Sequence, residues 1–310
     1  MKSIQFPKPL NSGDLIQVVS PAGPVDETRL NKGIARLRNW GYRVRVAPHA
    51  LSRCDYLAGS DSERSEDLIN AFTDPDVKAI ICSRGGYGSA RILGDIPWRK
   101  LRELPPKYFI GFSDISAILL QLWSKSCWIS LSGPQAGMAL SGDMSKRSVD
   151  SLKSFLKGDY SNAAWSVEKI TLNRIRGISA EGMVVPSCMS ILVSLIGTPW
   201  MPNLEGAIVC LEDLNEAPYK IDRMLMQLRD SNVLYGISGI VLGHFRLDGE
   251  NISKQVGGMV SDLFSEYDFG IWYGLPWGHV DDRITIPMGV NTSISEDGTF
   301  QYNISNQVRQ

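Results

Sequence analysis

Short apolar runs alternate with amphipathic segments through the first half of the chain. The strand-like runs are Leu15–Val19, Tyr42–Val46, Val77–Cys82 and Tyr108–Gly111. Helical spacing of apolar residues marks Arg29–Trp40, Ser62–Phe72 with Ser62 as its N-cap, Ala90–Leu93 and Asp114–Lys125. Strands that alternate with helices predict βαβ units, in which helices cover both faces of a parallel sheet. We therefore predict an α/β fold whose N-terminal domain is flavodoxin-like or Rossmann-like.

The pattern changes in the second half of the chain. Residues 158–176 are polar and irregular, and they are predicted to form a linker. Strand-like runs follow at Gly206–Leu211, Gly236–Leu242, Arg283–Pro287 and Thr299–Ile304. Helical patterns lie at Ile221–Asp230 and Lys254–Phe264, and a hairpin turn is predicted at Glu296–Gly298. The predicted organisation is an N-terminal domain over residues 1–157, the linker, and a mixed, β-rich C-terminal domain over residues 177–310.

Composition and charge argue against several classes of protein. The chain has 310 residues, which suits two domains or one large one. Lys and Arg number 32 against 33 Asp and Glu, so the net charge of −1 gives no general reason to expect nucleic acid or an anionic membrane as a partner. The five cysteines form no C-x-x-C pair and suit a reducing compartment. No apolar run resembles a signal sequence or reaches the ~18 residues of a membrane span, so we expect a cytoplasmic protein.

Ser113 stands in a sequence context that is typical of a catalytic nucleophile. An apolar strand runs through Gly111-Phe112-Ser113 directly into an apolar helix, as in a nucleophile elbow. The match to G-x-S-x-G is incomplete, because Ile115 replaces the last glycine. A helix N-terminus behind the serine would favour developing negative charge. The alternative is that Ser113 only caps this helix, because serine is a preferred N-cap residue.

Two further loops carry candidate chemistry at strand ends. The Gly-rich loop Ser83–Ser89 could present backbone N–H groups to a phosphate or an oxyanion. It matches neither a P-loop nor a dinucleotide fingerprint. The alternative is that this loop is only a flexible turn. The segment Leu211–Tyr219 holds Glu212, Asp213 and Glu216, which could form a metal cluster, supply the acid of a triad or face solvent. No histidine lies nearby in sequence and no calcium-loop spacing is present, so no metal site is predicted.

The chain has three histidines, and this limits the choice of a catalytic base. His49 follows an N-terminal strand, and His244 ends the strand-like run Gly236–Leu242. His279 lies in a loop before the strand predicted at Arg283–Pro287. From the residues alone, His244 and His279 are nearly equal candidates.

Five motifs occur in an order that resembles a known family. They are RGGYGSARIL, GFSDISAIL, SLIGTPWMP, LEDLNEAPYKIDRMLMQL and the Gly-His of LPWGHV. In this order they are similar to the L,D-carboxypeptidases, the S66 serine peptidases, and the resemblance covers nearly the whole chain. This family includes enzymes that trim the terminal D-alanine from murein tetrapeptides, and also microcin-C immunity peptidases. The resemblance implies an N-terminal domain that carries the serine, a C-terminal domain that carries a glutamate and a histidine, and a homodimer.

The resemblance also implies roles for individual residues. Ser113 would be the nucleophile, His279 the base, and Glu212, the first acid of LED, the group that orients the imidazole. The backbone N–H groups of Gly86 and Asp114 would form the oxyanion hole. No cofactor and no metal are implied.

One segment departs from the family pattern and leaves the exact substrate open. Pro186–Met189 stands where family members often have Gly-Gly-Asn-Leu, at the border of the active-site cleft. The cation that reads the substrate carboxylate is not indicated by any motif. Arg84, together with Gly85, is the candidate, and an exposed loop arginine is the alternative.

Three functions are compatible with these observations. The leading hypothesis is a serine carboxypeptidase that releases D-alanine from a murein tetrapeptide during cell-wall recycling. The second is an immunity-type peptidase that cleaves a peptidyl or aminoacyl adenylate, with Trp165 or Trp200 as a stacking surface for the base. The third is a non-catalytic two-domain protein that closes on a small ligand.

Overall fold

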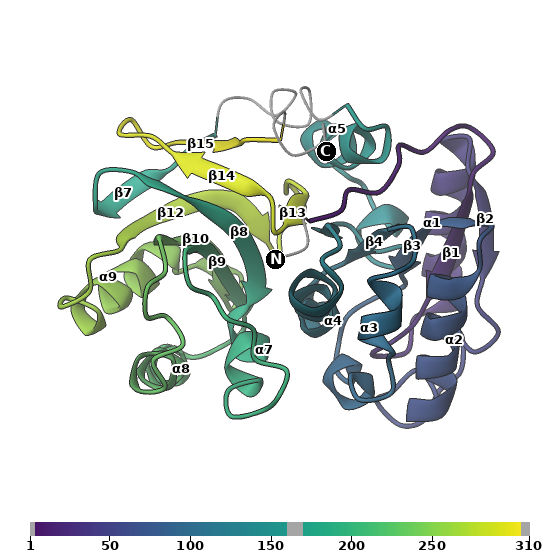
Figure 1. Cartoon of the computed structure of the whole chain (residues 1–310), viewed down its shortest axis with the longest axis horizontal. Helices are drawn as coiled ribbons and strands as arrows, with labels where there is room; N and C mark the ends of the chain where they lie inside the picture. Colours follow the sequence, from purple (N-terminus) through teal and green to yellow (C-terminus); the bar gives the residue numbers. More distant parts are fainter. Residues whose placement is uncertain (1–3, 160–169, 305–310) are drawn as a thin grey trace.

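A six-stranded, mostly parallel sheet forms the centre of the first lobe (Figure 1). The computed structural model describes residues 4–159 and 170–304. The sheet has the order β13-β5-β4-β3-β1-β2, with bounds β1 (Leu15–Val19), β2 (Arg43–Val46), β3 (Val77–Cys82), β4 (Tyr108–Gly111), β5 (Ser130–Ser132) and β13 (Ile286–Met288). Strands β1 to β5 pair in parallel, and only β13 is antiparallel to its neighbour. The predicted βαβ arrangement of the first half is confirmed.

Helices cover both faces of this sheet because its strands are apolar on both sides. Helices α1 (Glu27–Asn39) and α5 (Lys146–Leu156) pack in one core with Ala79 and Ile81 of β3. Helix α2 (Asp61–Thr73), the short helix α3 (Trp98–Leu101) and helix α4 (Ser116–Gln121) pack in the other core with Ile80 and Cys82.

Two helix predictions need correction. The N-cap of α2 is Ser60 and not Ser62, because the Ser60 hydroxyl accepts from the Glu63 amide while the Glu63 carboxylate accepts from the Ser60 amide. The helix predicted at Asp114–Lys125 consists of three parts, a 3₁₀ turn (Ser113–Ile115), α4 and a π-helical turn (Leu122–Ser126).

The second lobe is built on a nine-stranded mixed sheet. Its order is β6-β15-β14-β8-β9-β10-β12-β7, with β11 paired to β10. The bounds are β6 (Ile170–Thr171), β7 (Asn173–Arg176), β8 (Ala180–Cys188), β9 (Ala207–Leu214), β10 (Gly239–Leu247), β11 (Glu250–Asn251), β12 (Gly270–Gly278), β14 (Asn291–Ile294) and β15 (Thr299–Tyr302). The central strands β8, β9, β10 and β12 are parallel, and the outer pairs are antiparallel. The predicted fold class, an α/β protein with a mixed, β-rich second part, is confirmed.

Among residues 170–304, the helices of the second lobe are α7 (Met189–Ser194), α8 (Pro218–Asp230) and α9 (Ser253–Leu263). Of the segment predicted as a linker, residues 170–176 form β6 and β7 in the second sheet, and residues 160–169 lie outside the described part of the chain. Within residues 4–159 and 170–304, no helix is both long enough and apolar enough to cross a membrane.

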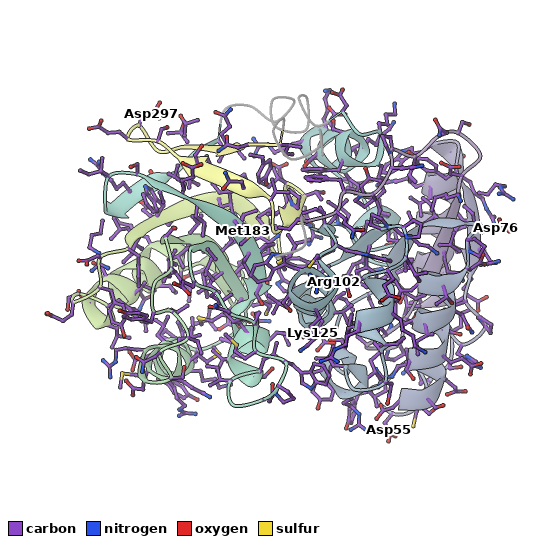
Figure 2. The ribbon with its side chains drawn as sticks, viewed as in Figure 1. Asp55, Asp76, Arg102, Lys125, Met183 and Asp297 are labelled. Carbon is purple, nitrogen blue, oxygen red and sulfur yellow. The ribbon has the colours of Figure 1, made fainter. Side chains whose placement is uncertain are left out.

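The two lobes are held together by chain crossings and by side chains. Strand β13 comes from the C-terminal part of the sequence but pairs with β5 of the first sheet, and it lies between the lobes in Figure 1. Lys125, labelled near the middle of Figure 2, reaches from the first lobe to the carbonyl of Pro199 at 3.2 Å and to the Trp200 ring at 5.1 Å. Gln121 donates to the Trp200 carbonyl at 2.7 Å.

Candidate active site

Ser113 follows the carboxyl end of β4 in a strained backbone conformation. Its φ is +63°, in the left-handed region that residues other than glycine rarely adopt. The side chains on either side of it, Phe112 and Asp114, are buried, whereas Ser113 is partly exposed. The Ser113 hydroxyl makes no capping bond to the helix that follows. The turn therefore presents the hydroxyl at the sheet edge, and the capping role considered from the sequence is not seen.

The buried Asp114 fixes the Ser113 turn by hydrogen bonds with Ser89. Its carboxylate accepts from the Ser89 amide at 2.8 Å, and its carbonyl accepts from the Ser89 hydroxyl at 2.5 Å. Burial raises the pKa of Asp114, and the bonds from Ser89 oppose this shift. Ser89 ends the Gly-rich loop, so these contacts fix the nucleophile turn to that loop.

The Gly-rich loop is packed against Ser113. A Cβ atom built at Gly85 would lie 3.0 Å from the Ser113 Cβ and 3.2 Å from its Oγ. The Arg64 guanidinium, which is buried, donates to the Gly88 carbonyl at 2.9 Å and holds the far end of the loop. Gly86 is exposed at a φ of +106°, and within the described residues its amide has no acceptor. A fixed loop that packs on Ser113 and holds an amide without a partner can bind an oxyanion.

The buried Glu212 and the partly exposed His279 form a hydrogen-bonded pair. Glu212 lies near the end of β9 and is fully buried, with its Oε2 2.7 Å from His279 Nδ1. Burial raises the pKa of Glu212, and the hydrogen bond and charge of His279 oppose the shift. Since a carboxylate on Nδ1 fixes the imidazole tautomer, the pair suits a general base.

The other two carboxylates of this segment face elsewhere. Asp213 accepts from the amides of Ser190 at 2.8 Å and Leu214 at 2.9 Å. Glu216 lies 3.6 Å from Lys220 as an ion pair. Among the described residues, no group of three or more His, Cys, Asp or Glu side chains is arranged to hold a metal ion.

The His279 ring reaches the serine turn through Phe112. The two ring centroids are 4.7 Å apart at an angle of 57°. Phe112 directly precedes Ser113, so the imidazole lies beside the nucleophile turn without a direct hydrogen bond to the Ser113 hydroxyl. Such bonds are often loose in the absence of substrate. The structure thus brings the three predicted triad residues to one place from two lobes.

The other histidines lie outside this chain of contacts. His244 is inside β10, opposite Gly278, and its Nδ1 is 3.2 Å from the Asn251 amide nitrogen. Burial lowers the pKa of His244. His49 pairs with Asp67 at 2.9 Å in the first lobe.

The other positions predicted from the sequence lie in the loop next to Ser113, beside Glu212, or farther away. Arg84 donates to the Pro24 carbonyl at 3.1 Å and is half-buried in the loop next to Ser113. Cys188, in the segment that departs from the family pattern, is paired with Glu212 across β8 and β9. Trp200 contacts Lys125 beyond the far end of α4, and Trp165 lies outside the described residues.

Arg283 and Trp277 were not singled out from the sequence, yet both contact Phe112. The Arg283 guanidinium lies 4.9 Å from the Phe112 ring centroid, and the Trp277 ring meets it edge-on at 5.8 Å. The Trp277 indole also donates to the Ser132 hydroxyl of β5 at 3.1 Å. No local sequence signal marks these residues, because their contacts with Phe112 join segments more than 160 positions apart.

A serine on a strained turn beside a carboxylate-bound imidazole is the arrangement that serine hydrolases use. Comparison with known proteins agrees with this class. Family models for the LD-carboxypeptidase N-terminal domain and the LD-carboxypeptidase C-terminal domain match residues 16–133 and 181–294. The chain therefore belongs to the LD-carboxypeptidase family, peptidase S66.

Individual relatives extend this likeness over nearly the full length. The murein tetrapeptide carboxypeptidase of Pseudomonas aeruginosa is 28% identical over 93% of this chain and 94% of its own. The crystal structure of muramoyltetrapeptide carboxypeptidase from Oxalobacter formigenes shows 30% identity and a TM-score of 0.76, covering 93% of this chain and 97% of that one. The microcin C7 self-immunity protein MccF, at 21% identity, shares the fold with a TM-score of 0.83, covering 95% of this chain and 96% of that one.

Proposed function

We propose that this protein is a serine carboxypeptidase that hydrolyses the L,D-peptide bond before the terminal D-alanine of a murein tetrapeptide. The observation that carries the proposal is the Glu212–His279 pair, whose imidazole lies on Phe112 immediately before the strained Ser113. The names of the Pseudomonas and Oxalobacter relatives support the substrate class.

The proposed reaction uses these residues in a fixed order. The Ser113 Oγ attacks the carbonyl carbon of the scissile bond, while the free ring nitrogen of His279 takes the hydroxyl proton. Glu212 accepts from Nδ1–H, holds the tautomer and stabilises the imidazolium that forms. The C–N bond then breaks, D-alanine leaves with the proton from His279, and the acyl group stays on Ser113. A water molecule, deprotonated by the same imidazole, hydrolyses this ester.

The developing oxyanion needs donors that are fixed before the reaction. The backbone N–H groups of Gly86 and Asp114 are the proposed donors, since the Gly86 amide is exposed and the Asp114 amide directly follows the nucleophile. Removal of one such donor typically costs about 10²–10³ in kcat. Because Asp114 and Arg64 hold the turn and the loop together, the hole would exist before substrate arrives.

The substrate carboxylate needs a cation near Ser113. We propose Arg84, with Gly85 beneath it, for this role, because the half-buried guanidinium belongs to the loop that packs on the serine. Removal of its charge should raise KM for a tetrapeptide more than it lowers kcat. We also propose that the protein acts in the cytoplasm as a homodimer, in line with the family resemblance.

A panel of three compounds tests the function. The protein is incubated with L-Ala-D-Glu-(diamino acid)-D-Ala, with an all-L tetrapeptide and with an aminoacyl sulfamoyl adenylate, and products are read by mass spectrometry. We expect free D-alanine from the first compound only, and a covalent adduct on Ser113 early in the reaction. Cleavage of the adenylate analogue alone would replace this proposal by the immunity-type activity. Tight binding without any cleavage would favour the non-catalytic protein.

A further inference from the structure

The Phe112 ring is held on three sides by one segment of the second half of the chain. The centroid of the Phe112 ring lies 4.7 Å from that of the His279 ring and 5.8 Å from that of the Trp277 ring, which it meets edge-on. The guanidinium carbon of Arg283 lies 4.9 Å from the Phe112 centroid. Phe112 itself is 2% exposed. Any shift of this ring would therefore move both Ser113, its chain neighbour, and the imidazole that lies on it.

Arg283 contacts the chain on both sides of the proposed triad. Its Nη1 donates to the Gly278 carbonyl at 3.2 Å, directly before His279. Its guanidinium lies over Phe112, directly before Ser113. Its own backbone is fixed, because the Arg283 amide donates to the Ser148 hydroxyl of α5 at 2.9 Å. One side chain thus touches the residue before the nucleophile and the residue before the base.

The charge of Arg283 also acts on the Glu212–His279 pair. Burial lowers the pKa of Arg283, while the Glu212 carboxylate raises it, and Arg283 in turn lowers the pKa of Glu212. Both side chains keep a buried polar atom with no hydrogen-bond partner in the described residues, Nε of Arg283 and Oε1 of Glu212. The two make no direct ion pair within residues 4–159 and 170–304. Arg283 is half-buried, and leaving its buried Nε unpaired costs stability, so its position calls for a functional reason.

Other ionisable groups lie around the pair. They are His279 on the loop after β12, Asp213 next to Glu212 on β9, Cys188 on β8 and Asp281 on the same loop as Arg283. Arg246 of β10 also reaches this place, with its Nη1 3.5 Å from the His279 carbonyl oxygen.

We propose that Arg283 is a positioning residue for the triad, which aligns the serine turn with the His279 loop through its contacts with Phe112 and Gly278. This inference rests on the proposed function, because it assigns Ser113, Glu212 and His279 their triad roles. The contacts of Arg283 then set kcat, because they fix where the imidazole lies relative to the Ser113 hydroxyl.

The alignment can be read without any substrate. The chain has three histidines, so protein labelled with ¹⁵N-histidine gives three imidazole environments that single His→Ala variants assign. The His279 signal depends on the Phe112 ring that lies against the imidazole. At one fixed pH, we expect both Arg283→Gln and Arg283→Lys to change the chemical shifts of the His279 ring, because each variant loses the guanidinium contact with Phe112. Arg229→Gln removes a guanidinium that pairs with Asp230 on α8 and serves as the matched control.

The contact effect is read in D-alanine release. Lys keeps the charge but loses the planar stack on Phe112, so Arg283→Lys should lower kcat by roughly tenfold or more, with little change in KM. Arg283→Gln should lower kcat at least as much, because it loses the same contacts with Phe112 and Gly278. Unchanged signals of His49 and His244 would show that each variant is folded.

Two results would overturn the proposal: an Arg283→Gln protein whose His279 signal coincides with that of the unsubstituted protein, or an Arg283→Lys protein with full kcat. If Arg283→Gln fails to fold, Arg283→Lys still decides the contact effect. A failure of the proposed function is seen separately, as the absence of D-alanine release by the unsubstituted protein, because the ¹⁵N spectrum does not depend on turnover.

Discussion

Gly85 packs so closely on Ser113 that a side chain at Gly85 would meet the nucleophile. The position of its absent Cβ is 3.2 Å from the Ser113 hydroxyl and 3.1 Å from the Phe112 carbonyl. Contacts this short leave no room for a methyl group unless the loop or the serine turn moves. Glycine is therefore required here for close approach of two backbones.

Gly85→Ala should reduce activity far more than stability. The added methyl would push the loop, and the Gly86 amide with it, away from the position of the oxyanion, so kcat should fall by roughly 10²-fold. Steady-state kinetics together with thermal unfolding measures both effects. Gly258→Ala is the matched control, because nothing lies within 4 Å of that position in α9 and alanine favours the helix by roughly 0.5–1 kcal/mol. Equal kinetics for the two variants would contradict the packing argument.

The strained backbone of Ser113 should lower the free energy of unfolding of a protein that needs this serine as its nucleophile. Because its φ is +63°, Ser113→Gly should raise the free energy of unfolding by about 1 kcal/mol while removing the nucleophile. Ser113→Ala keeps the strain, so its stability should stay near that of the parent, and its kcat should fall by roughly 10⁴-fold or more. Urea unfolding and D-alanine release give the two readings. A Gly variant less stable than the Ala variant would show that the turn carries no strain.

The two histidines of the second lobe should respond differently to truncation. His279→Ala removes the only imidazole that contacts Glu212 within the described residues, and turnover should be lost. His244→Ala removes a side chain that bonds Asn251, so most of the kcat should remain, with some loss of stability. Parallel assays of both variants, with circular dichroism as the check on folding, decide the assignment. It fails if His244→Ala is inactive and His279→Ala is not.

Lys107 should make stability depend on pH in the alkaline range. The side chain is buried, and its Nζ donates to the Ala71 carbonyl at 2.9 Å near the end of α2. Burial lowers the pKa of Lys107 from 10.5 to about 8, so between these values the unfolded chain binds more protons than the folded protein. The contribution of Lys107 to the free energy of unfolding therefore rises with pH through this window.

Comparison with Lys107→Met isolates that contribution from other titrating groups. Urea unfolding at pH 7.5 and 9.5 should show the parent gaining about 2 kcal/mol relative to the variant at the higher pH. A difference that stays constant between the two pH values would mean that Lys107 remains charged in the folded protein.

Local sequence patterns predicted the strands that are mainly apolar, and they failed where glycine and proline interrupt a strand or where two serines compete as N-cap. Strands β1, β3 and β4 have the predicted bounds, because mainly apolar runs bounded by turns define them. Strand β12 was missed, since its sequence GIWYGLPWG contains glycines and a proline that interrupt any strand pattern. The N-cap of α2 was misplaced, although Ser60 and Glu63 show the S-x-x-E spacing of a capping box.

The residues of the candidate site also differ in whether the sequence around them indicates their role. Ser113 is marked by its own neighbours in the sequence, and the family motifs indicate Glu212 and His279. Arg283 has no such mark, because its part depends on Phe112, which is 171 positions away in the sequence. Only the folded chain shows which distant segments meet.

Strand β13 makes the two lobes topologically inseparable. The chain leaves the second sheet at β12, passes His279, contributes β13 to the first sheet and then returns to the second sheet as β14. A fragment cut near residue 157 would lack the strand that completes the first sheet beside β5. Heating should therefore produce one cooperative transition in calorimetry, and neither half expressed alone should refold. The same crossing ties the base to both lobes, so opening and closing motions of the lobes would pull directly on the loop that carries the imidazole.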